Sequence, residues 1–150
     1  MALFSSVLMV CIGNICRSPT AEYALRQKLS EKNSDIIVAS AGLHGLTGHT
    51  ADESASRFAK TVGVDLSQHS ARKLTREMVH QYDLVLVMEI SHVKAVEQLA
   101  PESRGKVHLL GCWNNNIEIP DPYRRGDAAY QQALDLIVPA VDSWVVRLVR

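Results

Sequence analysis

The sequence predicts an α/β fold with three layers, in which helices cover both faces of a four-stranded parallel sheet. Short apolar runs alternate along the chain with segments of helical character, and this order is typical of parallel sheets. The chain has 150 residues, so we expect one domain over residues 1–150, large enough to bury a sizeable core. Hydrophobic residues make up 47% of the chain, an ordinary share for a globular domain.

Four apolar segments are the predicted strands. Each is short, is bounded by polar or turn residues, and is apolar enough to be buried on both faces of a sheet. In chain order, the predicted strands are Val7–Val10, Ile36–Ala41, Leu84–Met88 and Val107–Leu110.

The predicted helices lie between and after these strands. We expect Ser18 to cap the first helix, with Pro19 at its first position, and Asp52 to cap a helix that ends at Gly63. Pro139 lies inside the last helix, where the lost hydrogen bond predicts a kink or a break. The first helix is predicted to cover Pro19–Lys32, and the last Asp127–Arg147. Two further helices are predicted at Thr75–Gln81 and Ser91–Leu99.

Charge and cysteine content narrow the possible functions. The 16 basic and 16 acidic residues balance, so the overall charge favours neither nucleic acid nor an anionic membrane as a partner. No stretch approaches the roughly 20 apolar residues of a membrane span, and residues 1–10 lack the basic leader of a signal peptide. Three cysteines in such a chain favour reactive thiols in a reducing compartment. We therefore expect a cytoplasmic protein that does not insert into membranes.

The loop after the first predicted strand carries the main chemical signal. Its residues, which lead into the helix start, are Cys11, Ile12, Gly13, Asn14, Ile15, Cys16 and Arg17. Such a loop can aim several backbone N–H groups at one point, where the helix dipole adds positive charge. Arg17 can bind two phosphate oxygens with its planar guanidinium, and Gly13 is expected to supply backbone freedom. We therefore predict that residues 12–17 bind phosphate.

The same positive field favours the thiolate form of Cys11, which is the nucleophilic form. The sulfur would attack the phosphorus of a bound ester and form a cysteinyl-phosphate that water then hydrolyses. Because the loop itself neutralises the phosphoryl oxygens, we expect no metal and no other cofactor. The histidines without metal-ligand spacing, which we expect to be surface or packing residues, are His44, His49, His80, His92 and His108. For Cys11 alone, a buried cysteine at a strand end is the alternative.

Asp121 is the candidate proton donor. The carboxyl ends of parallel strands meet at one edge of a sheet, so the loop after the fourth strand can bring Asp121 over Cys11. Pro120 and Pro122 stiffen the chain on either side of this aspartate. A general acid would protonate a phenolate leaving group. The alternative is that Pro-Asp-Pro is only a turn.

The segment Val10–Pro19 resembles the signature loop of the low-molecular-weight protein tyrosine phosphatases. The resemblance covers nearly the whole chain, and its further matches are Ser40-Ala41-Gly42, Asp83-Leu84, Met88-Glu89 and Asp121-Pro122-Tyr123. Ala100-Pro101-Glu102 and residues 119–124 resemble the bacterial members, which usually act on tyrosine autokinases that control export of capsule or exopolysaccharide.

This resemblance implies the phosphotyrosine phosphatase I-like fold and a phosphotyrosine protein as substrate, and the substrate we expect is such an autokinase. It implies that Cys11 is the nucleophile, that Arg17 binds phosphate and the transition state, and that Asp121 is first the general acid and then the base. Phosphate, vanadate and similar oxyanions should inhibit competitively.

Three further residues have supporting roles in this interpretation. The Asn14 side chain would hold the loop in a strained shape, and the Ser18 hydroxyl would donate to the Cys11 thiolate. His69 falls where the family often has a histidine that braces the loop asparagine, although a surface histidine is the alternative. Oxidation of Cys11 could be trapped as a disulfide with Cys16, by analogy with the family.

The pocket walls should select the substrate. Ile12 and Tyr123 are natural wall residues, and Leu46 falls about where animal members carry a tryptophan, although it could simply pack the loop. Arg124 falls where those members often carry a second aromatic residue. The rim is therefore more basic, which would suit an acidic or multiply phosphorylated tyrosine tail.

Two other functions compete with the phosphatase. A thiol-dependent arsenate reductase would need further cysteines after the third strand, where Met88-Glu89-Ile90-Ser91-His92 has none, and it would leave Asp121 unused. A non-catalytic phosphotyrosine-binding module should lack the nucleophile, the arginine or the acid, and all three are present.

Overall fold

The computed structural model describes residues 4–149; residues 1–3, the start of the segment expected to lack a leader, and residue 150 lie outside it. The strands are β1 (Ser6–Cys11), β2 (Ile37–Gly42), β3 (Leu84–Val87) and β4 (Val107–Leu109). The helices are α1 (Arg17–Glu31), α2 (Glu53–Lys60), α3 (Arg76–Gln81), α4 (Ile90–Leu99), the 3₁₀ helix η1 (Pro101–Ser103) and α5 (Asp127–Leu148).

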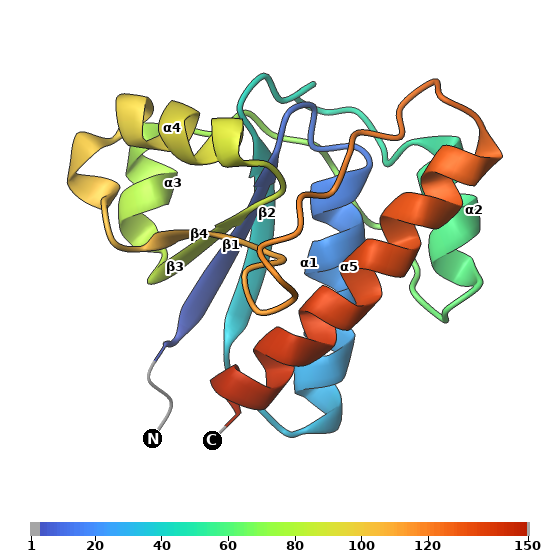
Figure 1. The fold of residues 1–150 in the computed structure, drawn as a ribbon, viewed down its shortest axis with the longest axis horizontal. Helices are drawn as coiled ribbons and strands as arrows, with labels where there is room; N and C mark the ends of the chain where they lie inside the picture. The colour runs from blue at the N-terminus through green and yellow to red at the C-terminus, as the bar shows by residue number, and fades with distance from the viewer. Residues whose placement is uncertain (1–3, 150) are drawn as a thin grey trace.

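The strands form one parallel sheet in the order β2-β1-β3-β4. Side chains of β1 alternate between two cores: Val7 and Met9 pack with α1, α2 and α5, while Leu8 and Val10 pack with α3 and α4. Figure 1 shows these two groups of helices on opposite sides of the sheet. The predicted three-layer α/β fold with four parallel strands is confirmed.

Two helix starts differ from the prediction. Helix α1 begins at Arg17 with Cys16 as its N-cap, and Ser18 makes no capping bond. The Ser18 hydroxyl is instead engaged by Cys11 and Asn14 of the preceding loop, which is why it is not free to cap. Helix α4 begins at Ile90, with Glu89 as N-cap, one residue before the predicted start.

Two other expectations concern helix ends and breaks. Asp52 caps α2 as predicted, accepting a hydrogen bond from the backbone of Ala55 at 3.1 Å, but this helix ends at Lys60 rather than at Gly63. Helix α5 is continuous through Pro139, so the break considered for this position is wrong. Apolar packing of α5 against α1 and α2 outweighs the loss of one backbone hydrogen bond.

The parallel sheet brings distant segments together at its carboxyl edge. Cys11 at the end of β1 pairs with Gly42 at the end of β2, and Val10 pairs with Val87 at the end of β3. The segments that follow these strands therefore start side by side, and the candidate residues lie on them. Among residues 4–149, no helix combines the length and the apolar character needed to cross a membrane.

Candidate active site

Residues 11–17, called here the cradle loop, connect β1 to α1. Carbonyl groups of this loop accept hydrogen bonds from the segment after β2: Cys11 from Leu43 at 2.9 Å, Ile12 from His44 at 2.9 Å, and Gly13 from Leu46 at 3.1 Å. No backbone hydrogen bond within residues 4–149 uses the N–H groups of residues 12–16 as donors. The carbonyl groups are thus bonded to the segment after β2, and the N–H groups of residues 12–16 are left to bind an anion at the N-terminus of α1.

Asn14 holds the shape of the cradle loop. It is fully buried and has a φ of 61°, the left-handed conformation that asparagine tolerates better than most residues. Its amide nitrogen donates to the hydroxyls of Ser18 at 2.8 Å and Ser40 at 2.9 Å, and its amide oxygen accepts from the backbone N–H of Arg72 at 2.9 Å. The side chain thus faces away from any bound phosphate, and only its backbone can bind one.

The glycine that the cradle loop needs is Gly42, not Gly13. Gly13 does not adopt a positive φ, and a Cβ there would meet only side-chain atoms at ordinary distances, 3.7 Å or more. A Cβ on Gly42 would collide with the carbonyl oxygen of Ile12 and lie 2.9 Å from the backbone nitrogen of Asn14. The prediction that Gly13 supplies the backbone freedom is therefore wrong. The left-handed conformation is at Asn14, and the close approach to the loop backbone is made by Gly42 at the end of β2.

His69 lies buried beneath the loop, with Nε2 2.6 Å from the carbonyl oxygen of Asn14. This is the contact that the resemblance implies, and the alternative of a surface histidine does not hold. Behind it, the Ser40 hydroxyl donates to the buried carboxylate of Glu22 at 2.6 Å. Glu22 also pairs with Arg26 at 2.7 Å, so the network under the loop ends in a charged pair that reaches the surface.

Arg17 is 2% exposed and is held at one end of its guanidinium. Its Nη1 donates to Glu89 Oε2 at 2.6 Å and to the carbonyl oxygen of Ile119 at 2.8 Å. Its Nη2 lies 3.8 Å from Asp121 Oδ2. A buried arginine fixed in this way keeps its remaining N–H groups available for oxyanion binding without losing side-chain entropy on binding.

Asp121 lies on residues 118–126, called here the acid loop. Its side chain is exposed, and its Oδ1 accepts a hydrogen bond from the backbone N–H of Tyr123 at 3.1 Å. This bond is the turn that the alternative interpretation anticipated. The same carboxylate also faces Arg17. Asp121 therefore both forms the turn and lies beside the cradle loop, so the two interpretations are compatible.

A cavity of about 200 Å³ joins the two loops. Its floor includes Cys11, whose sulfur is 2.8 Å from the Ser18 hydroxyl. The residues that line it are Cys11, Ile12, Gly13, Ile15, Cys16, Arg17, His44, Leu46, Asp121 and Tyr123. The predicted wall residues therefore surround the sulfur, with Leu46 and Tyr123 partly exposed at the mouth. Arg124 stacks on the Tyr123 ring, 5.1 Å from its centroid.

Residues 6–150 match the family described as "Low molecular weight phosphotyrosine protein phosphatase". The chain belongs to this family. It is 46% identical over 147 residues to the low molecular weight protein-tyrosine-phosphatase Etp of Escherichia coli K12, covering 98% of this chain and 97% of that one. Because the relatives are named as protein-tyrosine-phosphatases, the predicted hydrolase class is confirmed.

Solved structures of similar proteins agree with this family. The tyrosine phosphatase Wzb from Escherichia coli K30, in complex with sulphate, has a TM-score of 0.92 at 44% identity, covering 97% of this chain and 99% of that one. AmsI of Erwinia amylovora has a TM-score of 0.93 at 42% identity, covering 99% and 95%. The YwlE arginine phosphatase is more distant, with a TM-score of 0.88 at 25% identity and 95% coverage of each chain.

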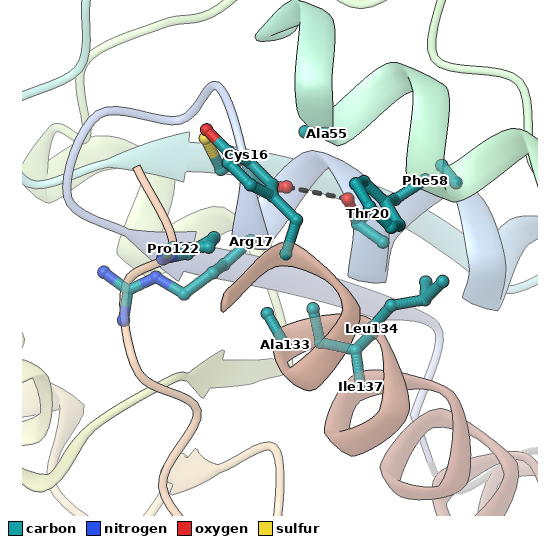
Figure 2. A pocket seen from close by; sticks show the side chains of 11 residues that line it. Cys16, Arg17, Thr20, Ala55, Phe58, Pro122, Ala133, Leu134 and Ile137 are labelled. Atoms are coloured by element: carbon teal, nitrogen blue, oxygen red, sulfur yellow. Dashed lines mark hydrogen bonds between the residues drawn. The ribbon is translucent and has the colours of Figure 1, made fainter. Parts of the chain in front are cut away.

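The cradle loop of this low molecular weight phosphatase is packed tightly from behind. Figure 2 shows Cys16, Thr20 and Phe58 near Leu134 and Ile137, with the Thr20 hydroxyl donating to the Cys16 carbonyl at 2.8 Å. The space between them is only about 20 Å³. Burial, and then the charge of Asp52, raises the pKa of the Cys16 thiol, so Cys16 is a neutral thiol at neutral pH. Cys11 and Cys16 are both free, and the disulfide between them stays a prediction.

Sequence reasoning missed several residues of this site. Glu89, which binds Arg17, and Glu22 and Ser40, which support Asn14, were not assigned roles. Glu89 and Ser40 did stand in segments that match the family, Met88-Glu89 and Ser40-Ala41-Gly42, and that match was the available signal. Glu22 carried no such signal, because only the packing of α1 against β2 brings it to Ser40.

Proposed function

We propose that this protein hydrolyses phosphotyrosine in proteins, with Cys11 as the nucleophile and a cysteinyl-phosphate as the intermediate. The observation that carries this proposal is the cavity itself. A sulfur, unpaired backbone N–H groups and a fixed guanidinium surround its floor, and a carboxylate stands at its mouth. These are the groups that phosphoryl transfer without a metal needs.

The first step begins with a phosphate ester seated in the cradle loop. The N–H groups of residues 12–16 and the free side of Arg17 bind its three non-bridging oxygens, and their charge is neutralised most strongly as it develops in the transition state. The Ser18 hydroxyl lies 2.8 Å from the Cys11 sulfur and can donate a hydrogen bond to it as it attacks. The sulfur attacks phosphorus in line with the leaving oxygen, and Asp121 gives its proton to the phenolate.

The second step reverses the role of Asp121. The carboxylate, now ionised, takes a proton from a water molecule that attacks the cysteinyl-phosphate. Phosphate and the Cys11 thiolate are the products. The exposed position of Asp121 suits this step, because water must reach the carboxylate after the phenol leaves.

The cavity walls favour a phenyl ring above the phosphate. Ile12, Leu46 and Tyr123 are apolar or aromatic, and they line the cavity over Cys11. Phosphoserine is too short to span such walls, and the charged guanidinium of phosphoarginine, the substrate class in the name of YwlE, would lose its hydration there. Wzb of Vibrio vulnificus has been solved with benzylphosphonate, in which a methylene group joins a phenyl ring to a phosphonate, and this supports a ring in the corresponding pocket here.

The physiological substrate we propose is a bacterial tyrosine autokinase that controls export of exopolysaccharide or capsule, dephosphorylated in the cytoplasm. The similarity to Etp, Wzb and AmsI supports this choice. Arg124, which stacks on Tyr123 of the cavity wall, adds positive charge that suits an acidic phosphotyrosine tail. Phosphate and sulphate are bound by Wzb of Escherichia coli K30, and we propose phosphate and vanadate as competitive inhibitors here.

Turnover of p-nitrophenyl phosphate by the wild type and by Cys11→Ser tests the mechanism. We expect the substitution to abolish turnover while phosphate binding is retained, because the cradle loop does not depend on the sulfur. Turnover that survives in Cys11→Ser would sink the proposal. Peptides that carry phosphotyrosine, phosphoserine or phosphoarginine test the substrate class, and equal rates on all three would contradict selection by the cavity walls.

A further inference from the structure

His92 is a buried histidine that no step of the proposed reaction uses. It is 3% exposed and is the third residue of α4. It forms a capping box with Glu89, in which His92 Nδ1 accepts from the backbone N–H of Glu89 at 3.2 Å. The expectation that His92 is a packing residue is thus confirmed by its burial, but the residue also makes polar contacts with Glu89, which binds Arg17.

The capping box determines which nitrogen of His92 carries the proton. Because Nδ1 accepts a hydrogen bond, the proton of the neutral ring is on Nε2. Nε2 lies 3.4 Å from Glu89 Oε2, and the same oxygen accepts from Arg17 Nη1 at 2.6 Å. The three side chains thus form one chain of polar contacts that runs from α4 to the cavity floor.

The surroundings keep the His92 ring neutral. Burial first, and then the positive charge of Arg17, lowers the pKa of His92, and the carboxylates of Glu89, Asp121 and Glu118 oppose this shift only in part. A neutral imidazole can accept at one nitrogen and donate at the other, whereas an imidazolium can only donate. The neutral form is therefore the one that can hold both the backbone and the carboxylate of Glu89.

We propose that His92 is a positioning residue for Arg17, acting through Glu89; this inference rests on the proposed function. The Glu89 side chain is 33% exposed, and without the capping box it is free to turn toward water. Arg17 Nη2 lies 3.8 Å from Asp121, so an unsecured guanidinium would pair with the acid instead of the phosphate. His92 fixes the carboxylate, the carboxylate fixes Nη1, and the other N–H groups of Arg17 stay directed at the oxyanion.

Two substitutions of His92 separate positioning from packing. His92→Leu replaces the ring with an apolar side chain of moderate size that has no polar atom. His92→Gln keeps an acceptor for the Glu89 backbone N–H. The measurements are the dissociation constant for inorganic phosphate, kcat for p-nitrophenyl phosphate, and Tm. We expect His92→Leu to weaken phosphate binding and to lower kcat by about tenfold each, the size of a coupling between neighbouring polar groups, and His92→Gln to recover most of both.

A purely structural role would give another pattern. In that case both variants would lower Tm while phosphate affinity and kcat, measured well below Tm, stayed at wild-type values, and the proposal would be overturned. Phosphate affinity is also measured in the Cys11→Ser background, where no turnover occurs. A failure of the proposed function therefore appears as turnover independent of Cys11, and a failure of this inference appears as unchanged phosphate binding.

A double-mutant cycle with Glu89 tests the route of the effect. If His92 acts through Glu89, His92→Leu weakens phosphate binding in the wild type but adds nothing in Glu89→Ala, because the carboxylate it orients is absent. Additive losses in the double variant would overturn the proposed route. Circular dichroism of each variant at the assay temperature confirms that folded proteins are compared.

Discussion

The cradle loop and the acid loop meet over the same cavity but are built in opposite ways. In the cradle loop, Asn14 and Arg17 are buried, and each of their side chains has several polar partners. In the acid loop, Asp121 and Tyr123 are exposed, and the Asp121 carboxylate accepts one backbone bond. Anion binding is thus preorganised by folding, whereas the proton donor stays open to the leaving group and to water.

The difference predicts two kinds of mutational effect. Breaking a buried hydrogen-bond network leaves polar groups without partners, at about 1–3 kcal/mol for each group. An exposed ion pair contributes about 0–1 kcal/mol. Changes at the buried polar residues of the cradle loop, Asn14 and Arg17, should therefore lower stability and activity together, while changes in the acid loop should lower activity alone.

Asp121→Ala gives the largest expected loss of activity within the acid loop, and it leaves the fold intact. We expect kcat for phenyl phosphates to fall by about 10²–10⁴-fold, the usual contribution of a general acid, with an unchanged Tm. Steady-state kinetics with leaving groups of different basicity measure this effect. The loss should shrink for leaving groups that need no proton, and an equal loss for all of them would argue against the acid role.

Gly42→Ala should disturb the cradle loop from outside it. The added methyl group presses on the backbone of Ile12 and Asn14, and overpacking of this kind costs about 1–3 kcal/mol. We expect a lower midpoint in urea and weaker phosphate binding. The matched control is Gly13→Ala, whose methyl group meets only ordinary contacts, so its urea midpoint should stay near that of the wild type. A larger loss of stability in the control would reverse our assignment.

Two substitutions of Asn14 divide its backbone role from its side-chain role. Asn14→Gly removes the three side-chain hydrogen bonds but keeps access to the left-handed conformation, whereas Asn14→Ala loses both. Asn14→Ala should therefore be less stable than Asn14→Gly by about 1–2 kcal/mol, the cost of that conformation for a residue with a Cβ. Urea denaturation measures this difference in stability, and equal stability of the two variants would show that the left-handed conformation of Asn14 carries no strain.

Cys16→Ser tests the predicted disulfide. After inactivation by peroxide, we expect dithiothreitol to restore less activity in this variant than in the wild type, because no second thiol traps the oxidised Cys11. Since burial raises the pKa of Cys16, its thiolate is scarce at neutral pH, and trapping in the wild type should become faster as pH rises. Equal recovery in both proteins would refute the disulfide.

Arg124→Ala should have the smallest effect. This exposed residue contacts the Tyr123 ring rather than the cavity floor, so we expect KM for an acidic phosphotyrosine peptide to rise by up to about fivefold, the equivalent of one exposed charge pair. The KM for p-nitrophenyl phosphate, which does not reach the rim, serves as the control. The same change in both KM values would show that Arg124 shapes the cavity and not the peptide contact.

The sequence by itself determined what is local. The apolar segments marked the four strands because each contributes buried apolar side chains, and β1 and β3 are buried along their whole length. Residues 11–17 marked an anion-binding loop because a strand end, a loop and a helix start are contiguous there. Asp121 was accessible to prediction because carboxyl ends of parallel strands share one edge. These inferences need residue types and order along the chain, but no knowledge of distant partners.

Only the tertiary structure decided which distant groups meet. The strand order puts β3 beside β1, and so Glu89 reaches Arg17, and His92 contacts Glu89 in turn, although Glu89 and His92 are more than 70 residues from Arg17 in the chain. Tertiary contacts also decide that the left-handed conformation lies at Asn14 and the close backbone approach at Gly42, and that neither lies at Gly13. They place the Ser18 hydroxyl against Cys11, where it does not cap the helix. Local propensity is weak compared with the cost of leaving a buried polar group unpaired, so the three-dimensional partners determine these roles.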